Sequence, residues 1–143
     1  MWIFSNFQIM SVPIPDKFGI KYNTVEHYFQ AMKSLDPTVR KRIASLPHPG
    51  AAKKYGRKIA LREDWDNIKV KVMTHAVTFK FTKCEEHKEE LLEVTPGTRI
   101  VEVNYWHDNY WGSCSCSRCG NNGRNILGGI LIDIWKVFTK EDS

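Results

Sequence analysis

No stretch of the 143 residues comes near the roughly 18 apolar residues that a membrane-spanning helix requires. The first residues also lack the basic region and the long apolar core of a secretory signal peptide. These absences exclude membrane and secreted proteins, so we expect a cytoplasmic one. The chain has no repeat, low-complexity stretch or linker, and domains cluster at roughly 100–150 residues. We therefore expect a single domain over residues 1–143.

Acidic residues are absent from segment 40–62, which carries eight lysines and arginines. The remaining residues carry 13 basic and 16 acidic side chains, so the net charge of +5 comes from this segment. A general nucleic-acid binder has a positive field over the whole domain, which this chain lacks. The segment is either a solvated helix face or a phosphate-binding site.

Cysteine is scarce, with Cys84 alone and Cys114, Cys116 and Cys119 close together. Without an export signal we expect reduced thiols. Three neighbouring thiolates suit zinc, which needs a fourth ligand, and either His107 or Cys84 is able to supply it. The alternative is three reduced thiols on a loop. A bound zinc would be a structural clip rather than a catalyst.

Helical spacing of apolar residues predicts a mainly α fold, formally α+β with minor strands. The expected helices cover residues 25–35, 38–46, 50–59, 64–81, 86–93 and 123–138, and short strands are expected before residue 24 and over 99–103. Thr24 and Asp64 are suitable N-caps. Buried faces are predicted at Val25, Tyr28, Phe29, Met32 and Leu35, at Trp65, Ile68, Val72, Ala76 and Phe79, and at Leu127, Leu131, Ile134 and Phe138.

Two groups of residues suggest chemistry. Glu26, Gln30 and Lys33 fall on one side of the first predicted helix, although an ordinary amphipathic helix has the same spacing. Segment 104–112 contains eight consecutive residues that donate, accept or stack, and it follows a predicted strand. Aromatic rings beside the carboxylate of Asp108 suit a flat base or a sugar. The alternative is a surface turn held by its aromatic residues.

Six segments, in order, carry a family resemblance. They are Phe4–Phe7, Thr24–Lys33, Tyr55–Arg57, Leu61–Trp65, Asn109–Gly112 and Gly123–Gly128. Together they resemble the motifs of the NADAR, or YbiA-like, N-glycosidase family over nearly the whole chain. The resemblance implies a compact, single-domain, mainly helical fold and a hydrolase that cleaves an N-glycosidic bond. The cysteine segment is a departure, because it is absent from the best-known bacterial member of the family, in which this loop is rich in glycine.

The resemblance also implies roles for single residues. It places the catalytic residues at Glu26, Trp65 and Asp108, with Lys33 as the amine that attacks the ribose anomeric carbon. It places the substrate-binding residues at Phe4, Asn6, Phe7, His27, Arg57, Trp111 and Asn125. Breaking a C–N glycosidic bond builds positive charge that a carboxylate stabilises. An attacking lysine must be neutral, and a nearby Glu26 would oppose the necessary fall in its pKa.

We therefore expect an N-glycosidase acting on a phosphorylated ribosyl substrate, such as the aminopyrimidine ribose phosphates of riboflavin biosynthesis. One alternative is an ADP-ribosyl hydrolase that releases ADP-ribose from guanine bases or nucleic acid. The other is a non-enzymatic, zinc-clipped module that binds nucleotide or nucleic acid. The expected partner is a small phosphorylated riboside or an ADP-ribose conjugate, with no membrane involved and no cofactor needed for catalysis.

Overall fold

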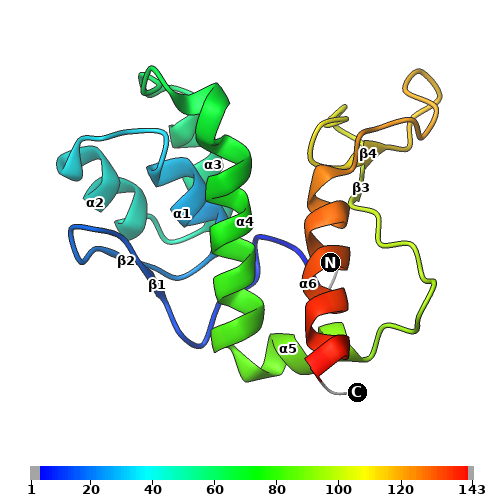
Figure 1. Ribbon diagram of the computed structural model, residues 1–143. Coiled ribbons are helices and arrows are strands. Elements are labelled where there is room, and N and C mark those ends of the chain that lie inside the picture. The colour runs from blue at the N-terminus through cyan, green and yellow to red at the C-terminus, as the bar shows by residue number, and fades with distance from the viewer. Residues whose placement is uncertain (1–3, 142–143) are drawn as a thin grey trace. The chain divides into compact units, whose positions relative to one another are not determined.

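The computed structural model describes residues 4–141 and has the mainly helical fold with minor strands that the sequence predicts (Figure 1). The chain forms two compact units, one ending at Lys88 and one beginning at Glu89, and the expectation of a single domain stays a prediction. The elements are β1 (Ile14–Pro15), β2 (Lys21–Tyr22), α1 (Val25–Ala31), α2 (Pro37–Ser45), α3 (Pro49–Gly56), α4 (Trp65–Lys83), α5 (Glu85–Leu92), β3 (Val103–Asn104), β4 (Ser113–Cys114) and α6 (Ile126–Glu141). Within residues 4–141, each helix is too short or too polar to cross a membrane.

Helix α1 is the centre of the first unit. It contacts α2, α3, α4 and β2, and each of its seven residues is buried (Figure 1). Thr24 caps it as predicted, because the Thr24 hydroxyl oxygen accepts a 3.0 Å hydrogen bond from the His27 amide. A helix buried on every side exposes no solvated polar face. Glu26 is therefore buried within the fold, which excludes an ordinary amphipathic helix with a solvated polar face.

Helix α1 ends four residues earlier than predicted. The amides of Lys33 and Ser34 donate to carbonyls three residues back, and the Ser34 hydroxyl accepts from the Asp36 amide. Local hydrogen bonds of this kind compete with a continued helix. Leu35, predicted to be buried, is consequently exposed.

Helix α4 buries a different face from the one predicted. Trp65 and Ala76 are buried as expected, but Ile68, Val72 and Phe79 are only half-buried. The other fully buried positions are Met73, Val77, Lys80 and Phe81. Asp64 occupies the N-cap position without capping the helix, because its carboxylate pairs with the Arg62 guanidinium at 2.6 Å.

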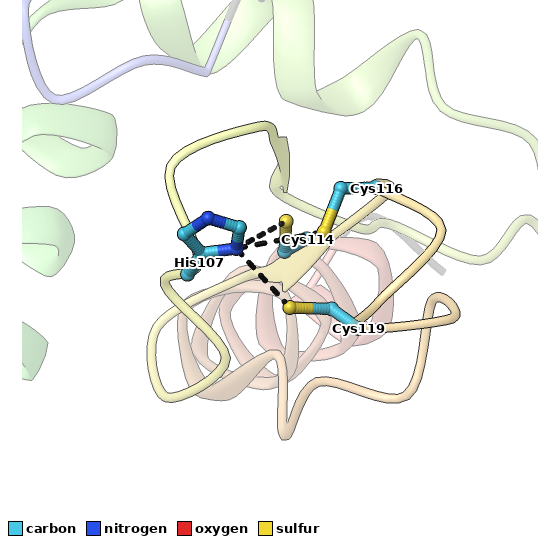
Figure 2. A group of neighbouring side chains, drawn as sticks. All are labelled: His107, Cys114, Cys116 and Cys119. Carbon is cyan, nitrogen blue, oxygen red and sulfur yellow. Dashed lines mark hydrogen bonds between the residues drawn. The ribbon is translucent and has the colours of Figure 1, made fainter.

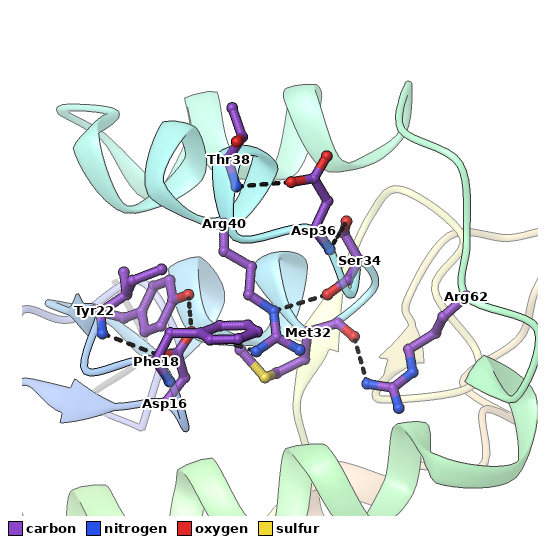
Figure 3. A network of polar contacts seen from close by, with 10 residues as sticks. Asp16, Phe18, Tyr22, Met32, Ser34, Asp36, Thr38, Arg40 and Arg62 are labelled. Carbon is purple, nitrogen blue, oxygen red and sulfur yellow. Dashed lines mark hydrogen bonds and ion pairs between the residues drawn. The ribbon is translucent and has the colours of Figure 1, made fainter.

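The basic segment 40–62 is divided in the structure. Arg40 is buried, and its guanidinium lies 3.4 Å from the Asp16 carboxylate and donates to the Ser34 carbonyl (Figure 3). The same carboxylate accepts the hydroxyl of Tyr22 at 2.8 Å. Arg40 is therefore a structural cation that ties α2 to the β1–β2 hairpin, not a phosphate ligand.

The second unit is built on α6. Its predicted apolar face is confirmed, since all four predicted residues, Leu127, Leu131, Ile134 and Phe138, are buried. Near the start of α6, β3 and β4 pair in parallel, with Val103 opposite Ser113 and Asn104 opposite Cys114 (Figure 1).

Residues 99–102 of the predicted strand are not in a strand, since β3 covers Val103–Asn104, and the helix predicted from residue 123 begins at Ile126. Both differences have one shared reason. Asn125 adopts a left-handed backbone (φ 53°), which a continuous helix excludes. Its side-chain amide accepts from the Glu102 amide at 2.9 Å and donates to the Ile100 carbonyl at 2.8 Å. An amide side chain thus takes the hydrogen bonds that a neighbouring strand would provide.

Candidate functional site

Glu26 lies in the first turn of α1, and its side chain is buried with only 7% of the residue exposed. Its amide donates to the Asn6 carbonyl at 3.1 Å, which joins the first motif to the second. Its carboxylate accepts a 2.7 Å hydrogen bond from Gln30 Nε2, one turn later on the same helix. Glu26 and Gln30, which were predicted to share a side of the helix, are therefore in direct contact.

Helix α3 approaches the Gln30 side chain at a glycine, Gly56. A Cβ added to Gly56 would overlap the side-chain oxygen of Gln30. That oxygen is buried and accepts no hydrogen bond from the described residues. A buried acceptor in this state is costly unless a ligand or water satisfies it. The position therefore offers a hydrogen-bond acceptor beside the Glu26 carboxylate.

Burial raises the pKa of Glu26, although the Gln30 hydrogen bond and the charges of Lys53, Lys33 and Arg57 partly counteract it. Burial lowers the pKa of Lys33; the carboxylate of Glu26 opposes this, whereas the cations Arg57 and Lys53 reinforce it. Both neutral forms are thus favoured relative to solvent-exposed side chains. The pKa values of the acid and the amine therefore shift toward each other, which is the pattern of a proton-transfer pair.

Lys33 lies in the turn that follows α1 and is half-buried. Its ammonium group lies 5.9 Å from the centre of the Phe29 ring, and its carbonyl accepts from the Arg62 amide at 2.8 Å. Phe29 in turn packs against Trp65 at 5.1 Å between ring centres. Trp65 is itself buried, so it packs behind the Phe29 ring that lies beside Lys33.

The other predicted residues of the first unit have varied positions. Arg57 is exposed at the end of α3. Asn6 and Phe7 are half-buried, and the Asn6 amide lies 3.5 Å from the Met73 sulfur. Phe4 is in the core, edge to face with Phe81 at 5.9 Å.

His27 is also buried, and both of its ring nitrogens have partners within the fold. Nδ1 lies 2.7 Å from the Thr24 hydroxyl and Nε2 lies 2.9 Å from the Leu46 carbonyl. These contacts use both hydrogen-bonding positions of the ring. His27 fastens the start of α1 to the end of α2, and its predicted contact with substrate stays a prediction.

Asp108 lies in the second unit and organises the loop between β3 and β4. One carboxylate oxygen accepts from the amides of Tyr110 and Trp111 at 3.1 and 3.0 Å. The Asn104 side chain accepts from the Asp108 amide and donates to its carbonyl. Trp111 is half-buried and meets Tyr110 edge to face at 4.9 Å.

The same loop caps α6. The amides of residues 124–127 donate to the carbonyls of residues 109–112 at 2.7–3.1 Å, in place of helical partners. Gly112 is necessary in this packing, because an added Cβ would overlap Glu102. The predicted substrate-binding residue Asn125 stands at this junction, with its side-chain amide bonded to the segment before β3 as described above. Loop 109–112 and the start of α6 therefore form one hydrogen-bonded structure.

Four potential metal ligands gather beside this structure (Figure 2). Nδ1 of His107 lies 3.3, 3.5 and 3.6 Å from the sulfur atoms of Cys119, Cys116 and Cys114. All four ligand atoms lie within 4.8 Å of one another, so the group is able to hold a metal ion such as zinc. A hydrogen bond from the Cys119 backbone, with help from the Cys114 thiol, lowers the pKa of Cys116 to about 6. Of the two fourth ligands considered, His107 is the one present, because the Cys84 thiol is buried in the first unit beside the Val12 carbonyl.

Helical spacing grouped Gln30 with Glu26 and Lys33 without giving it a role, and Gly56 was not among the residues predicted to form the site. Both residues lie inside segments that resemble the family. Because Gln30 is four residues after Glu26, helical spacing alone indicates the contact between Gln30 and Glu26. Nothing in the sequence indicates that Gly56 approaches Gln30, because that contact depends on how α3 packs against α1.

Comparison with known proteins adds a family and a fold. The NADAR domain model matches residues 1–138. The N-glycosidase YbiA of Shigella boydii is 33% identical, covering 92% of this chain and 78% of that protein, and an N-glycosidase of Nostoc punctiforme is 35% identical, covering 92% and 81%. A chloroplastic riboflavin biosynthesis protein, PYRR of Zea mays, is 33% identical over 92% of this chain and 22% of its own length. The NMR structure of YbiA from E. coli superposes with a TM-score of 0.78 at 34% identity, covering 98% of this chain and 79% of that one.

Proposed function

Because the chain belongs to the NADAR domain family, we propose that it is an N-glycosidase that hydrolyses the N-glycosidic bond of a phosphorylated ribosyl substrate. The proposed substrate is an aminopyrimidine ribose phosphate of the kind formed in riboflavin biosynthesis. The names of the relatives support both parts of this proposal, since two are N-glycosidases and a third is a riboflavin biosynthesis protein.

The observation that carries the proposal is the buried carboxyl of Glu26, which Gln30 holds on the helix that leads to the half-buried amine of Lys33. Burial raises the pKa of Glu26 and lowers the pKa of Lys33, which supports an acid and an amine nucleophile at these positions. A neutral amine is the nucleophile required for an imine, and a protonated carboxyl is the acid required by a departing nitrogen.

The proposed reaction proceeds through an imine on Lys33. When the ribose ring is open, C1 is joined to the aminopyrimidine nitrogen by a C=N bond, and Lys33 Nζ adds to C1. The bond from C1 to the aminopyrimidine nitrogen then breaks, and the two protons of Nζ pass to that nitrogen, carried by Glu26. Water hydrolyses the new C1=Nζ imine, which releases ribose phosphate and restores the lysine amine. No metal or organic cofactor is needed, because these groups perform each step.

Arg57 is the proposed phosphate ligand. It is exposed at the end of α3, and its charge already acts on both Glu26 and Lys33. An exposed guanidinium binds phosphate in a bidentate manner at little cost, whereas the buried Arg40 is occupied by Asp16. The basic segment thus divides into a structural part and a ligand-binding part.

The roles of Asp108, Trp111 and Asn125 rest on the family resemblance. A carboxylate at Asp108 would stabilise positive charge at C1, and the Trp111 ring would stack on the base. Substituting these three residues tests their contribution, because any change in activity then arises without a change to the residues of the first unit.

The deciding experiment is product analysis with purified protein. We expect incubation with an aminopyrimidine ribose phosphate to release free aminopyrimidine and ribose phosphate. A DNA oligonucleotide carrying ADP-ribose on guanine serves as the second substrate. Release of ADP-ribose from it, with the riboside untouched, would replace the proposal by the ADP-ribosyl hydrolase. Binding of either compound without turnover would instead make the protein a binding module.

A further inference from the structure

The second unit contains a complete set of zinc ligands that the proposed reaction does not use. The segment from residue 113 to residue 123 has no apolar side chain apart from its cysteines. Hydrophobic burial therefore contributes little to ordering it, although ordering each residue costs about 1–2 kcal/mol. The structure nevertheless folds this segment so that three sulfur atoms surround one imidazole nitrogen (Figure 2).

The distances between the ligand atoms match a tetrahedral zinc site. With zinc bonds of about 2.3 Å to sulfur and 2.0–2.1 Å to nitrogen, tetrahedral angles give nitrogen–sulfur separations of about 3.6 Å. The three separations from His107 Nδ1 are 3.3, 3.5 and 3.6 Å. Sulfur–sulfur separations of about 3.8 Å follow from the same geometry, and all ligand atoms here lie within 4.8 Å of each other. Small side-chain rotations would bring the four atoms onto one ion.

We propose that His107, Cys114, Cys116 and Cys119 bind one Zn²⁺ as a closed structural site. Four protein ligands fill the tetrahedral coordination shell, which leaves no position for water or substrate. One nitrogen and three thiolates also favour zinc over the oxygen-seeking calcium and magnesium.

The ligands lie on β4 and on the two segments that flank it, which we call the arms of the site. His107 precedes β4 in the loop that carries Asp108, Cys114 ends β4, and the other two follow it. The hydrogen bonds of the backbone already place these arms together: the Cys114 amide donates to the Asn109 side chain at 2.8 Å, and the Asn121 amide to the Cys114 carbonyl at 3.2 Å. Zinc joins the arms through much stronger bonds, so that its binding energy becomes folding energy.

The site has a consequence for the active residues, which rests on the proposed function. His107 is the immediate neighbour of Asp108, whose carboxylate holds the amides of Tyr110 and Trp111. Zinc binding at His107 therefore holds the turn that carries Asp108 and Trp111. Loss of zinc is expected to lower turnover through disorder of this loop, with the chemistry of Glu26 and Lys33 unchanged.

The test measures metal directly, in protein expressed with added zinc and purified without chelator. We expect about one zinc per chain, and about one cobalt after exchange, with the strong visible absorption of tetrahedral cobalt–thiolate sites. Cys116→Ser and His107→Ala are expected to lose this absorption and to bind zinc at least tenfold more weakly. Cys84→Ser removes a thiol outside the site, and Ser117→Ala changes the same loop without removing a ligand. Both controls are expected to keep one zinc per chain.

The outcomes separate the zinc site from the enzyme. Wild-type protein without zinc or cobalt binding overturns the site, and so does an intact mass lower by two hydrogens, which identifies a disulfide between the cysteines. If a ligand variant fails to fold, the cobalt spectrum of the wild type still decides. Zinc binding in a protein that cleaves neither test substrate supports the site and refutes only the proposed function.

Discussion

Gln30 Nε2 donates a 2.7 Å hydrogen bond to Glu26 Oε1, and this bond is buried between α1 and α3. The bond lowers the pKa of a carboxyl that burial raises, so Gln30 adjusts the acidity of Glu26 without touching the solvent. The side-chain oxygen of Gln30 is left as an acceptor beside the same carboxyl. Gln30 is therefore a positioning residue whose effect should be visible as a change in pH dependence.

Replacing Gln30 by methionine tests that effect. The variant removes a hydrogen bond that stabilises the charged carboxylate, so the pKa of Glu26 rises further. Since Glu26 acts as an acid in the proposed reaction, the alkaline limb of the pH–kcat profile is expected to move to higher pH. A profile identical to that of the wild type would contradict this role, whereas a merely structural defect would lower the rate at every pH.

Glu26→Gln is expected to separate activity from stability. Removing the proton carrier should lower turnover by about 10²-fold or more, and Asp108→Asn should do the same if its role is as the resemblance implies.

The folded protein has a raised Glu26 pKa, so the stability that this group contributes is present at low pH. It is lost as the pH rises from the unfolded value, about 4.3, through the folded value. The melting temperature of the Gln variant should therefore rise relative to that of the wild type as the pH increases above about 4, as followed by thermal denaturation.

Lys33 is expected to form a covalent adduct that borohydride traps. Reduction of the imine during turnover should add the mass of the reduced sugar phosphate to the peptide that contains Lys33. Lys33→Arg keeps the charge but loses the primary amine, and should yield no adduct. Lys54→Ala, an exposed lysine of α3, is the matched control and should label fully. An active Lys33→Arg enzyme would reduce the lysine to a cation that contacts the phosphate.

Two glycines of α3 offer a paired test of the contact with Gln30. An alanine at Gly56 would overlap the Gln30 side chain, whereas an alanine at Gly50 meets open space. Gly56→Ala is expected to cost about 1–3 kcal/mol and to change the pH profile as Gln30→Met does. Gly50→Ala should leave activity unchanged and stabilise the protein by up to about 1 kcal/mol, because alanine is the better helix former. Urea denaturation and the pH profile of each variant check these outcomes.

Two arginines of the basic segment should differ greatly in their effect on stability. Arg40→Met leaves the buried Asp16 carboxylate without its cation, at a cost of about 3–5 kcal/mol. Arg62→Met breaks a more exposed pair with Asp64 and should cost about 1 kcal/mol or less. Equal losses in chemical denaturation would contradict the division of the segment into buried and solvated cations.

The sequence was informative where function depends on spacing along one helix. Glu26 and Gln30 share a side of α1 because helical geometry determines which residues are neighbours, and Lys33 lies in the turn that follows the helix. The same reasoning extended α1 to Leu35, because periodicity does not register the local hydrogen bonds of Ser34 that end the helix. It also left the role of segment 40–62 open, since burial of Arg40 depends on the β1–β2 hairpin.

The choice between His107 and Cys84 as the fourth ligand also lay beyond the sequence. The spacing of the cysteines predicts three ligands but contains no information on which distant side chain approaches them. Asn125 shows a related limit. Its place in a family motif predicts substrate binding, which stays a prediction, and its side-chain amide is bonded to Ile100 and Glu102. The motif gives no sign of this second, structural role, because the hydrogen bonds join segments that are distant in the sequence.

The backbone of His107 has an energetic cost that the folded loop has to offset. Its φ of 68° is left-handed, which costs an L-residue with a side chain roughly 1–2 kcal/mol. The structure keeps this conformation next to Asp108, whose amide donates to the Asn104 side chain at 3.1 Å. The same backbone presents His107 Nδ1 to the three sulfur atoms, so the shape that the loop needs at Asp108 is also the shape that brings the metal ligands together.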